Sequence, residues 1–225
     1  MPARLICEKC GSFLVYWNHE EEIFVCDKCD HHSLFGDLAD QYRCSISIID
    51  FQLREIPEYL YERKYIKKLD FSAEPSDPFH APFANRISSI SSRIGRITDL
   101  EELDLSGNIL EEVPPAIGDC QNLRRLYLGN NYINWIPAEI GKLKNLETLI
   151  LRKNEIKSLP DEIGSLTNLK TLNLEDNQLT SLSKTILQLK NLENLRISGN
   201  TGLTSPPYAV AKQGLASIRS WFEHI

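Results

Sequence analysis

Four cysteines near the start of the chain have the spacing of metal ligands. Cys7 and Cys10 form one C-x-x-C pair, Cys26 and Cys29 form a second, and 15 residues separate the two pairs. This arrangement is typical of a tetrahedral Zn²⁺ site built from two cysteine knuckles. Four thiolates complete the coordination sphere and leave no position for a substrate water. We therefore expect one structural zinc ion per chain.

The segment between the cysteine pairs is predicted to form two strands. They run from Phe13 to Trp17 and from Ile23 to Val25, and they are joined around residues 18–22. With the cysteines, they resemble a zinc ribbon spanning residues 5–36. The resemblance implies a small domain, which we place at residues 1–40. A domain of this length needs such a staple because its hydrophobic core is small.

Other readings of the same cysteines remain open. They include a redox or disulfide role, iron in a rubredoxin-like site, and replacement of one cysteine ligand by His19, His31 or His32. A redox C-x-x-C pair is expected near a βαβ pattern, which this sequence lacks, and disulfides conflict with the reducing compartment inferred below. The histidine offsets do not improve on the complete cysteine quartet.

The rest of the chain is built from a repeat. Asparagine returns every 23 residues, and the run from Leu100 through Leu103 and Leu105 to Asn108 has the pattern L-x-x-L-x-L-x-x-N. The asparagines are Asn85, Asn108, Asn131, Asn154, Asn177 and Asn200. A fixed period of this kind indicates units that stack and share one core. The pattern resembles the intracellular, 23-residue, Ras-binding-type class of leucine-rich repeat proteins.

The resemblance implies an α/β leucine-rich repeat solenoid with a parallel concave sheet and a short, irregular or 3-10 convex side. We assign about seven repeats to residues 41–205, with an insertion at residues 74–84 that either helps binding or shields an edge. The asparagine amides are expected to satisfy main-chain groups in the turns, because an amide donates and accepts at once. Cys120 occupies a leucine position and is predicted to be a core thiol.

Residues 206–225 are predicted to form a C-terminal capping helix. Its apolar side chains can share one side at close to helical spacing, and they are Val210, Leu215, Ile218, Trp221 and Phe222. A cap would cover the open edge of the last strand. A docking helix for another protein is the alternative.

Residues that alternate with the inward leucines are predicted to face the concave side. Buried aromatic and arginine side chains carry most of the energy of protein interfaces. We therefore predict a partner-binding face from Arg125, Tyr127, Ile150, Arg152 and Arg196, to which we add the turn residue Trp135. Solvated charges, and packing of Trp135 on Tyr132 or a neighbouring turn, are the plainer readings.

The charge distribution argues against nucleic acid as the main partner. The net charge is −6, and residues 1–40 hold three basic and eight acidic side chains, whereas phosphate binding needs clustered Lys and Arg. Neither a membrane span nor a secretion signal is evident, so we expect a cytoplasmic protein, although a nuclear protein or an exported effector would look the same.

No catalytic motif accompanies these features. The sequence lacks G-x-x-x-x-G-K-[ST], G-x-S-x-G and H-E-x-x-H. We therefore predict a non-enzymatic adaptor or regulator that binds a protein rather than a small molecule. A nucleic-acid-associated factor that uses the zinc ribbon, and a ubiquitin-ligase accessory protein, are the alternatives.

Overall fold

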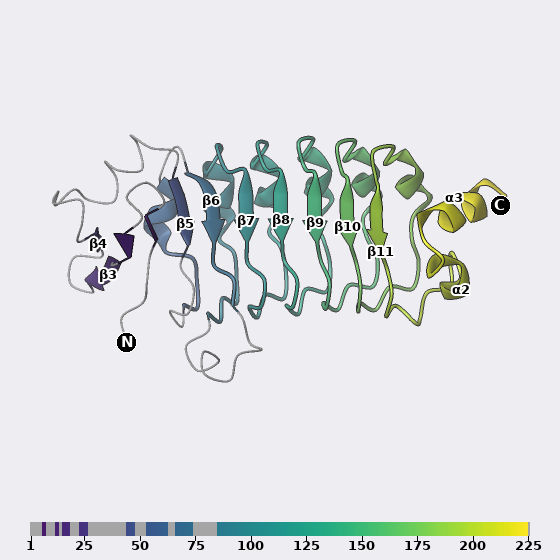
Figure 1. The fold of residues 1–225 in the computed structure, drawn as a ribbon, viewed down its shortest axis with the longest axis horizontal. Helices are drawn as coiled ribbons and strands as arrows, with labels where there is room; N and C mark the ends of the chain where they lie inside the picture. The colour runs from purple at the N-terminus through teal and green to yellow at the C-terminus, as the bar shows by residue number, and fades with distance from the viewer. Residues whose placement is uncertain are drawn as a thin grey trace.

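The computed structural model describes residues 6–7, 12–13, 15–18, 23–26, 44–47, 53–62, 66–73 and 85–224, and before residue 46 it describes the backbone of strands alone. The insertion predicted at residues 74–84 lies outside these ranges. Within them the chain winds into an elongated solenoid, with β5 near one end and the helices α2 and α3 at the other (Figure 1).

One parallel sheet runs along the solenoid. Its seven strands follow the order of the sequence, and each pairs only with its neighbours in the chain. They are β5 (Cys44–Ser47), β6 (Ile66–Asp70), β7 (Glu102–Asp104), β8 (Arg125–Tyr127), β9 (Thr148–Ile150), β10 (Thr171–Asn173) and β11 (Asn194–Arg196). This is the parallel sheet that the repeat predicted.

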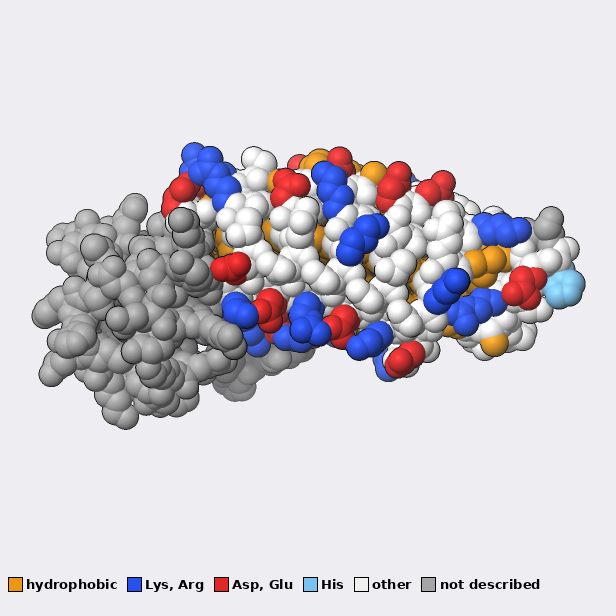
Figure 2. All heavy atoms as spheres, turned by 90° about the horizontal axis from the view of Figure 1, so that it is seen from above, with side chains coloured by type: hydrophobic (Ala, Val, Ile, Leu, Met, Phe, Trp, Pro, Cys, Tyr) orange, Lys and Arg blue, Asp and Glu red, His pale blue; other side chains and the backbone are white. Residues whose placement is uncertain are grey.

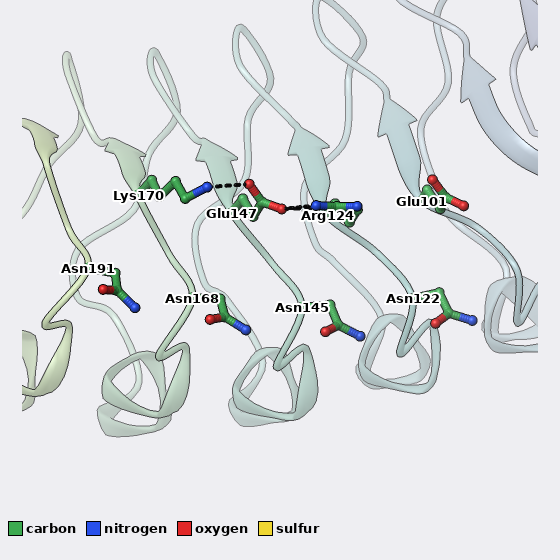
Figure 3. Close-up of a pocket in the computed structure, with 8 residues that line it drawn as sticks. All are labelled: Glu101, Asn122, Arg124, Asn145, Glu147, Asn168, Lys170 and Asn191. Atoms are coloured by element: carbon green, nitrogen blue, oxygen red, sulfur yellow. Dashed lines mark hydrogen bonds and ion pairs between the residues drawn. The ribbon is translucent and has the colours of Figure 1, made fainter.

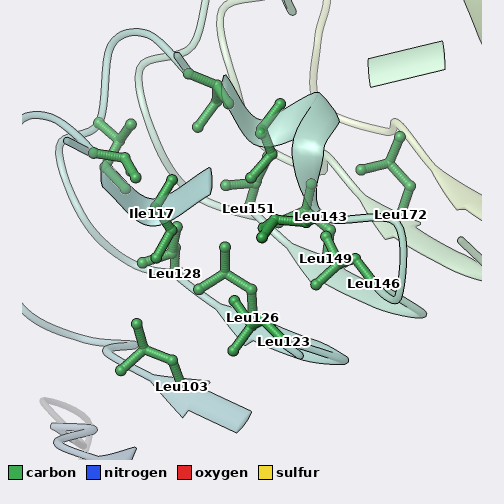
Figure 4. Close-up of a cluster of buried hydrophobic side chains, with 14 of the residues drawn as sticks. Leu103, Ile117, Leu123, Leu126, Leu128, Leu143, Leu146, Leu149, Leu151 and Leu172 are labelled. Atoms are coloured by element: carbon green, nitrogen blue, oxygen red, sulfur yellow. The ribbon is translucent and has the colours of Figure 1, made fainter. Parts of the chain in front are cut away.

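Leucines at equivalent positions of successive repeats fill the interior. Leu103, Leu126 and Leu149 pair in register across β7, β8 and β9, and each is fully buried. Alternation along a strand directs these side chains to one face of the sheet and their neighbours to the other. Figure 4 shows leucines from several turns meeting in the same core. Cys120 is buried in it as predicted, with its Sγ 3.3 Å from the carbonyl oxygen of Ile94.

Short 3-10 helices form the opposite side, as expected for units with few residues to return. They are η1 (Glu58–Glu62), η2 (Ser92–Arg96), η3 (Pro115–Asp119), η4 (Ala138–Lys142), η5 (Asp161–Ser165) and η6 (Lys184–Gln188). Pro114, Pro137 and Pro160 stand at the N-caps of η3 to η5 with φ between −66° and −68°. This is the angle that the proline ring imposes, so the Leu-Pro and Ile-Pro steps start each helix.

The predicted asparagines line up in one buried column. Asn131 donates from Nδ2 to the carbonyls of Leu105 and Leu128 at 3.0 and 3.1 Å, and its Oδ1 accepts the N–H of Leu110 at 3.0 Å. The same pattern recurs at Asn108, Asn154, Asn177 and Asn200. Asn85 joins the column in spite of the preceding insertion, because its Oδ1 accepts from the N–H of Leu53 at 3.2 Å. Each asparagine ties one turn to the turn before it.

The residue before each asparagine adopts the left-handed conformation. Gly107 and Gly199 supply it with φ of 76° and 81°, whereas Asn130, Lys153 and Asp176 adopt φ of 53° to 55°. A lysine is unusual there, since side chains with a Cβ disfavour this region. The tight turn that places the asparagine column therefore overrides the local preference of Lys153.

Two small antiparallel pairs precede the solenoid. β1 (Ile6–Cys7) pairs with β2 (Ser12–Phe13), and β3 (Val15–Asn18) pairs with β4 (Ile23–Cys26). The second pair is the hairpin expected around residues 18–22, shifted by one or two residues. β1 also lies against β5, the first strand of the long sheet.

The C-terminal segment contains two helices rather than the single helix predicted. α2 (Tyr208–Ala211) and α3 (Leu215–Glu223) are separated at Gly214, which has a φ of 101°. Ile218 and Phe222 are buried in the core as expected, but Val210 is only half-buried and Ala211 is buried in its place. The break turns α3 so that it packs over the last repeat.

Candidate functional site

The register of the sheet places the predicted concave residues in two straight columns. Successive strands pair residue for residue, so equivalent positions lie side by side. The first column is Lys68, Glu102, Arg125, Thr148, Thr171 and Asn194, and the second is Asp70, Asp104, Tyr127, Ile150, Asn173 and Arg196. We call the surface that they form, together with the residues two positions further along each strand, the concave face.

Arg125 is held by an acidic neighbour. Its Nε lies 2.5 Å from Oε2 of Glu102, and Nζ of Lys68 lies 3.0 Å from Oε1 of the same carboxylate. Burial by itself would raise the pKa of Glu102, but the hydrogen bonds from Arg125 and Lys68 outweigh it, so the pKa is lowered. The charge of Arg125 is therefore already balanced within the sheet. A partner would have to displace Glu102 to pair with it.

Two aspartates lie next to each other in the second column. Asp70 and Asp104 are partners in the register of β6 and β7. Asp104 accepts the N–H of Ser106 at 2.9 Å, and Asp70 accepts from both the N–H and the hydroxyl of Ser72. Burial raises the pKa of Asp104, and the negative charges of Asp70 and Glu102 raise it further, although the bonds from Ser106 oppose this.

The middle of the concave face is apolar and ends in an arginine. Tyr127 and Ile150 are adjacent across β8 and β9, and both are half-buried. Arg152 follows Ile150 by two positions and is exposed. Its stem passes over Gly129, where a Cβ would stand 3.2 Å from Cγ of Arg152. Arg196, the last predicted arginine, is exposed and lies 4.0 Å from a carboxylate oxygen of Glu175.

Trp135 lies apart from these residues. It sits in the turn between Asn131 and η4, on the far side of the asparagine column, with 41% of its surface exposed. Tyr132 in the same turn is 54% exposed. Trp135 and the concave residues therefore occupy different surfaces, and one flat contact on the concave face would not include both.

A second column of asparagines marks a surface that our sequence reasoning missed. Asn122, Asn145, Asn168 and Asn191 lie where the chain enters each strand, and the Nδ2 of each donates to a carbonyl 24 residues earlier at 2.8 or 2.9 Å. They line a groove of about 440 Å³ (Figure 3). Their interval of 23 residues is visible in the sequence and could have revealed them.

Charged side chains form the other wall of this groove. Glu147 lies between Arg124, whose Nε is 2.9 Å from Oε1, and Lys170, whose Nζ is 2.8 Å from Oε2. Lys170 and Arg124 lower the pKa of Glu147 to about 2. Lys67 and Glu101 also pair there. Seen from the strand starts, basic and acidic side chains alternate along the repeats (Figure 2). These charges largely compensate one another.

The predicted metal ligands lie at the border of the described structure. Cys7 ends β1 and Cys26 ends β4, as backbone positions. The side chains of both, and the whole of Cys10 and Cys29, lie outside the described residues. Among the residues that the structure does describe, no group of three or more His, Cys, Asp or Glu could hold a metal ion. No helix in the described ranges is long and apolar enough to cross a bilayer.

Comparisons with known proteins agree with the repeat pattern. The family model described as leucine rich repeat matches residues 98–156 and 144–201. A comparison with curated protein sequences finds no match. Among solved structures, a leucine-rich repeat protein of Leptospira interrogans is 31% identical, with a TM-score of 0.59 over 68% of this chain and 39% of its own.

Two further structures share the architecture. The plant peptide hormone receptor RGFR1, solved in complex with RGF2, is 33% identical, with a TM-score of 0.52 over 60% of this chain and 21% of its own. The leucine-rich repeat domain of the type III effector XopL is 23% identical, with a TM-score of 0.62 over 74% of this chain and 56% of its own, and this match shows the fold alone. The present chain thus spans well under two thirds of the Leptospira and plant proteins.

The matched residues, the parallel sheet and the asparagine column together make this chain a leucine-rich repeat protein. Domains of this class are generally scaffolds for protein–protein interaction without catalytic activity of their own. Their stacked repeats create an extended concave surface that suits such a role.

Proposed function

We propose that this protein is a non-enzymatic interaction module, an intracellular adaptor or regulator that binds a protein partner on the concave face. The observation that carries the proposal is the central strip of this face. There Tyr127 and Ile150 present half-buried apolar surface beside the exposed Arg152. Aromatic and arginine side chains next to apolar surface supply most of the binding energy in protein interfaces.

The plant receptor gives independent support for this kind of partner. Its title states that it is a peptide hormone receptor in complex with RGF2, and it shares one third of its aligned residues with the present chain. A repeat surface of the same class therefore accommodates a peptide ligand. We extend to this chain only the binding of a protein segment.

The experiment is capture and identification of a partner, followed by measurement with the purified pair. The intact chain is used as bait, bound proteins are identified by mass spectrometry, and their affinities are determined by calorimetry. The test variant replaces Tyr127 and Arg152 with Ala. The matched control replaces the exposed Lys184 of η6, on the opposite side of the solenoid, with Ala.

We expect the test variant to weaken the purified complex at least about a hundredfold, which is the loss of roughly two ordinary hot-spot contacts. The control should bind as the parent does, and both variants should keep the circular dichroism of the parent. Equal affinity for the parent and the test variant would rule out this face as the binding surface.

We also propose that Cys7, Cys10, Cys26 and Cys29 hold a structural zinc ion and that this ribbon caps the first repeat. The donor set fits Zn²⁺, which prefers four thiolates in a closed tetrahedral site. Two backbone features support the proposal. Cys7 pairs with Ser12 and Cys26 pairs with Val15, so one cysteine of each pair ends a strand that is folded against another. β1 lies against β5, which supports a capping role and leaves room for a second contact with a partner.

A further inference from the structure

The charges of the concave face are balanced in some places and unbalanced in others. Glu102 lies between Lys68 and Arg125, much as Glu147 lies between Arg124 and Lys170 at the strand starts. These clusters satisfy themselves, and surface pairs of this kind contribute little to binding or stability.

Three concave charges lack such a partner. In the part of the chain that the structure describes, neither Asp70 nor Asp104 forms an ion pair with a Lys, Arg or His. The guanidinium of Arg152 likewise has no hydrogen bond or ion pair with any described residue. The hydroxyl and N–H groups that hold the two aspartates orient them without neutralising them. The face therefore has an acidic site and a basic site that are both open to an incoming charge.

The apolar strip lies between these two sites. Asp104, Tyr127 and Ile150 are consecutive across β7, β8 and β9, and Arg152 lies two positions beyond Ile150. With strands about 4.8 Å apart and about 3.3 Å per residue along a strand, the acidic and basic sites are about 14 Å apart. An extended peptide covers that distance in about four residues.

We propose that the concave face recognises an extended protein segment in which a basic and an acidic residue are four positions apart with an apolar residue between them. The Lys or Arg of the segment faces Asp70 and Asp104, the apolar side chain covers Tyr127 and Ile150, and the Asp or Glu pairs with Arg152. This rests on the proposed function and adds to it the chemical class of the partner segment. The arrangement selects opposite charges at the two ends and rejects equal ones, because either equal pair places like charges together at one site.

Four synthetic peptide pools provide the probe. Their cores are Lys-x-Leu-x-Glu, Glu-x-Leu-x-Lys, Lys-x-Leu-x-Lys and Glu-x-Leu-x-Glu, where x is an equimolar mixture of uncharged residues. Binding to the intact, isotope-labelled chain is followed by NMR, which measures weak affinities and reports on the methyl group of Ile150 and the side chain of Arg152. Salt concentration is kept constant across the series, because it screens exposed charges.

We expect at least one mixed-charge pool to bind about tenfold more tightly than either like-charge pool, which corresponds to one charge-assisted contact. In the variant R152E, the preference should move to the Lys-x-Leu-x-Lys pool. The exposed Arg152 has no described partner to lose, so the fold should tolerate this change, and R152A provides a second variant in which the discrimination is lost without being reversed. The charge-matched control K184E on η6 should leave the preference unchanged.

Equal binding by all four pools, no binding by any pool, or an unchanged preference in R152E would each overturn the inference. The proposed function is tested separately by the loss of the purified partner on Tyr127→Ala and Arg152→Ala. If that loss occurs while the pools bind alike, the concave face remains the binding surface and only the charge assignment fails. If neither effect occurs, both fail.

Discussion

The side-chain oxygen of Asn131 accepts the backbone N–H of Leu110 at 3.0 Å, although the two residues belong to different repeats. The same amide donates to the carbonyl of Leu105 at 3.0 Å, again in the preceding repeat. Each buried asparagine thus serves as a rung between two turns. Without it, two main-chain groups in a water-free turn would have no partner.

Replacement of Asn131 with Ala should therefore be costly. We expect the free energy of unfolding to fall by about 3 kcal/mol, because a buried N–H and a buried carbonyl both lose a partner. Urea denaturation followed by circular dichroism measures the change. Asn122→Ala is the control, since it removes one bond at an exposed carbonyl that water can replace, and its effect should stay below about 1 kcal/mol. Equal losses in the two variants would contradict the role of the column.

A glycine on the convex side should tolerate no added methyl group. A Cβ at Gly118 would stand 2.4 Å from the carbonyl oxygen of Glu139 in the next repeat, a distance that requires the backbone to move. We expect Gly118→Ala to lower the free energy of unfolding by about 1 to 3 kcal/mol. At Gly202 the nearest atom is 3.8 Å away, so Gly202→Ala should leave the urea midpoint nearly unchanged. A stable Gly118→Ala variant would show that the turns can separate freely.

The carboxylate of Glu147 should titrate far below its ordinary range. Hydrogen bonds from Lys170 and Arg124 lower its pKa from 4.5 to about 2. Because the folded-state pKa is depressed, the contribution of these pairs to stability is present above pH 4.5 and is lost as the pH falls toward 2. Carboxyl carbon shifts measured by NMR against pH test this directly. Lys170→Ala should raise the midpoint, Lys184→Ala should not, and a midpoint near 4.5 in the parent would refute the pairing.

The thiol of Cys120 should be inert in the native protein. It is fully buried, and burial raises its pKa to about 12, so almost no thiolate forms at neutral pH. Treatment with iodoacetamide at pH 8, followed by digestion and mass spectrometry, should find Cys120 unmodified in the folded chain and fully modified in 8 M urea. Rapid modification without urea would mean that the core between η2 and η3 opens readily.

Removal of the metal should affect one end of the molecule. A strong chelator is expected to release about one zinc ion per chain and to unfold residues 1–40, because a four-cysteine site couples metal binding to folding. Hydrogen exchange measures protection along the chain, and the strands from β7 to β11 should keep theirs. The variant Cys120→Ser should still bind the metal, whereas Cys10→Ser should not. A chain that contains no zinc when purified under reducing conditions would exclude the site.

The repeat could be predicted in detail from sequence because its period is a local property. The spacing of Leu103, Leu126 and Leu149 specified which side chains enter the core, and the asparagine interval specified the turns. The concave columns followed as well, since alternation along a strand assigns each residue to a face. The second asparagine column at Asn122 carried the same period and was available to the same reasoning.

Other features depend on how neighbours meet in space. The sequence offered Arg125 and Arg152 as equivalent arginines, but Glu102 occupies the place beside Arg125 and no described acid lies beside Arg152. Charge pairing depends on side chains brought together from different repeats, which no single repeat encodes. Likewise, Gly214 only weakens a helix in the sequence, and the packing of Ile218 and Phe222 on the last repeat is what separates α2 from α3. The sequence by itself determined the solenoid and the residues on each face. The tertiary structure alone decided which of those charges are left to bind something else, because a charge is open only when the folded chain brings no counter-ion to it.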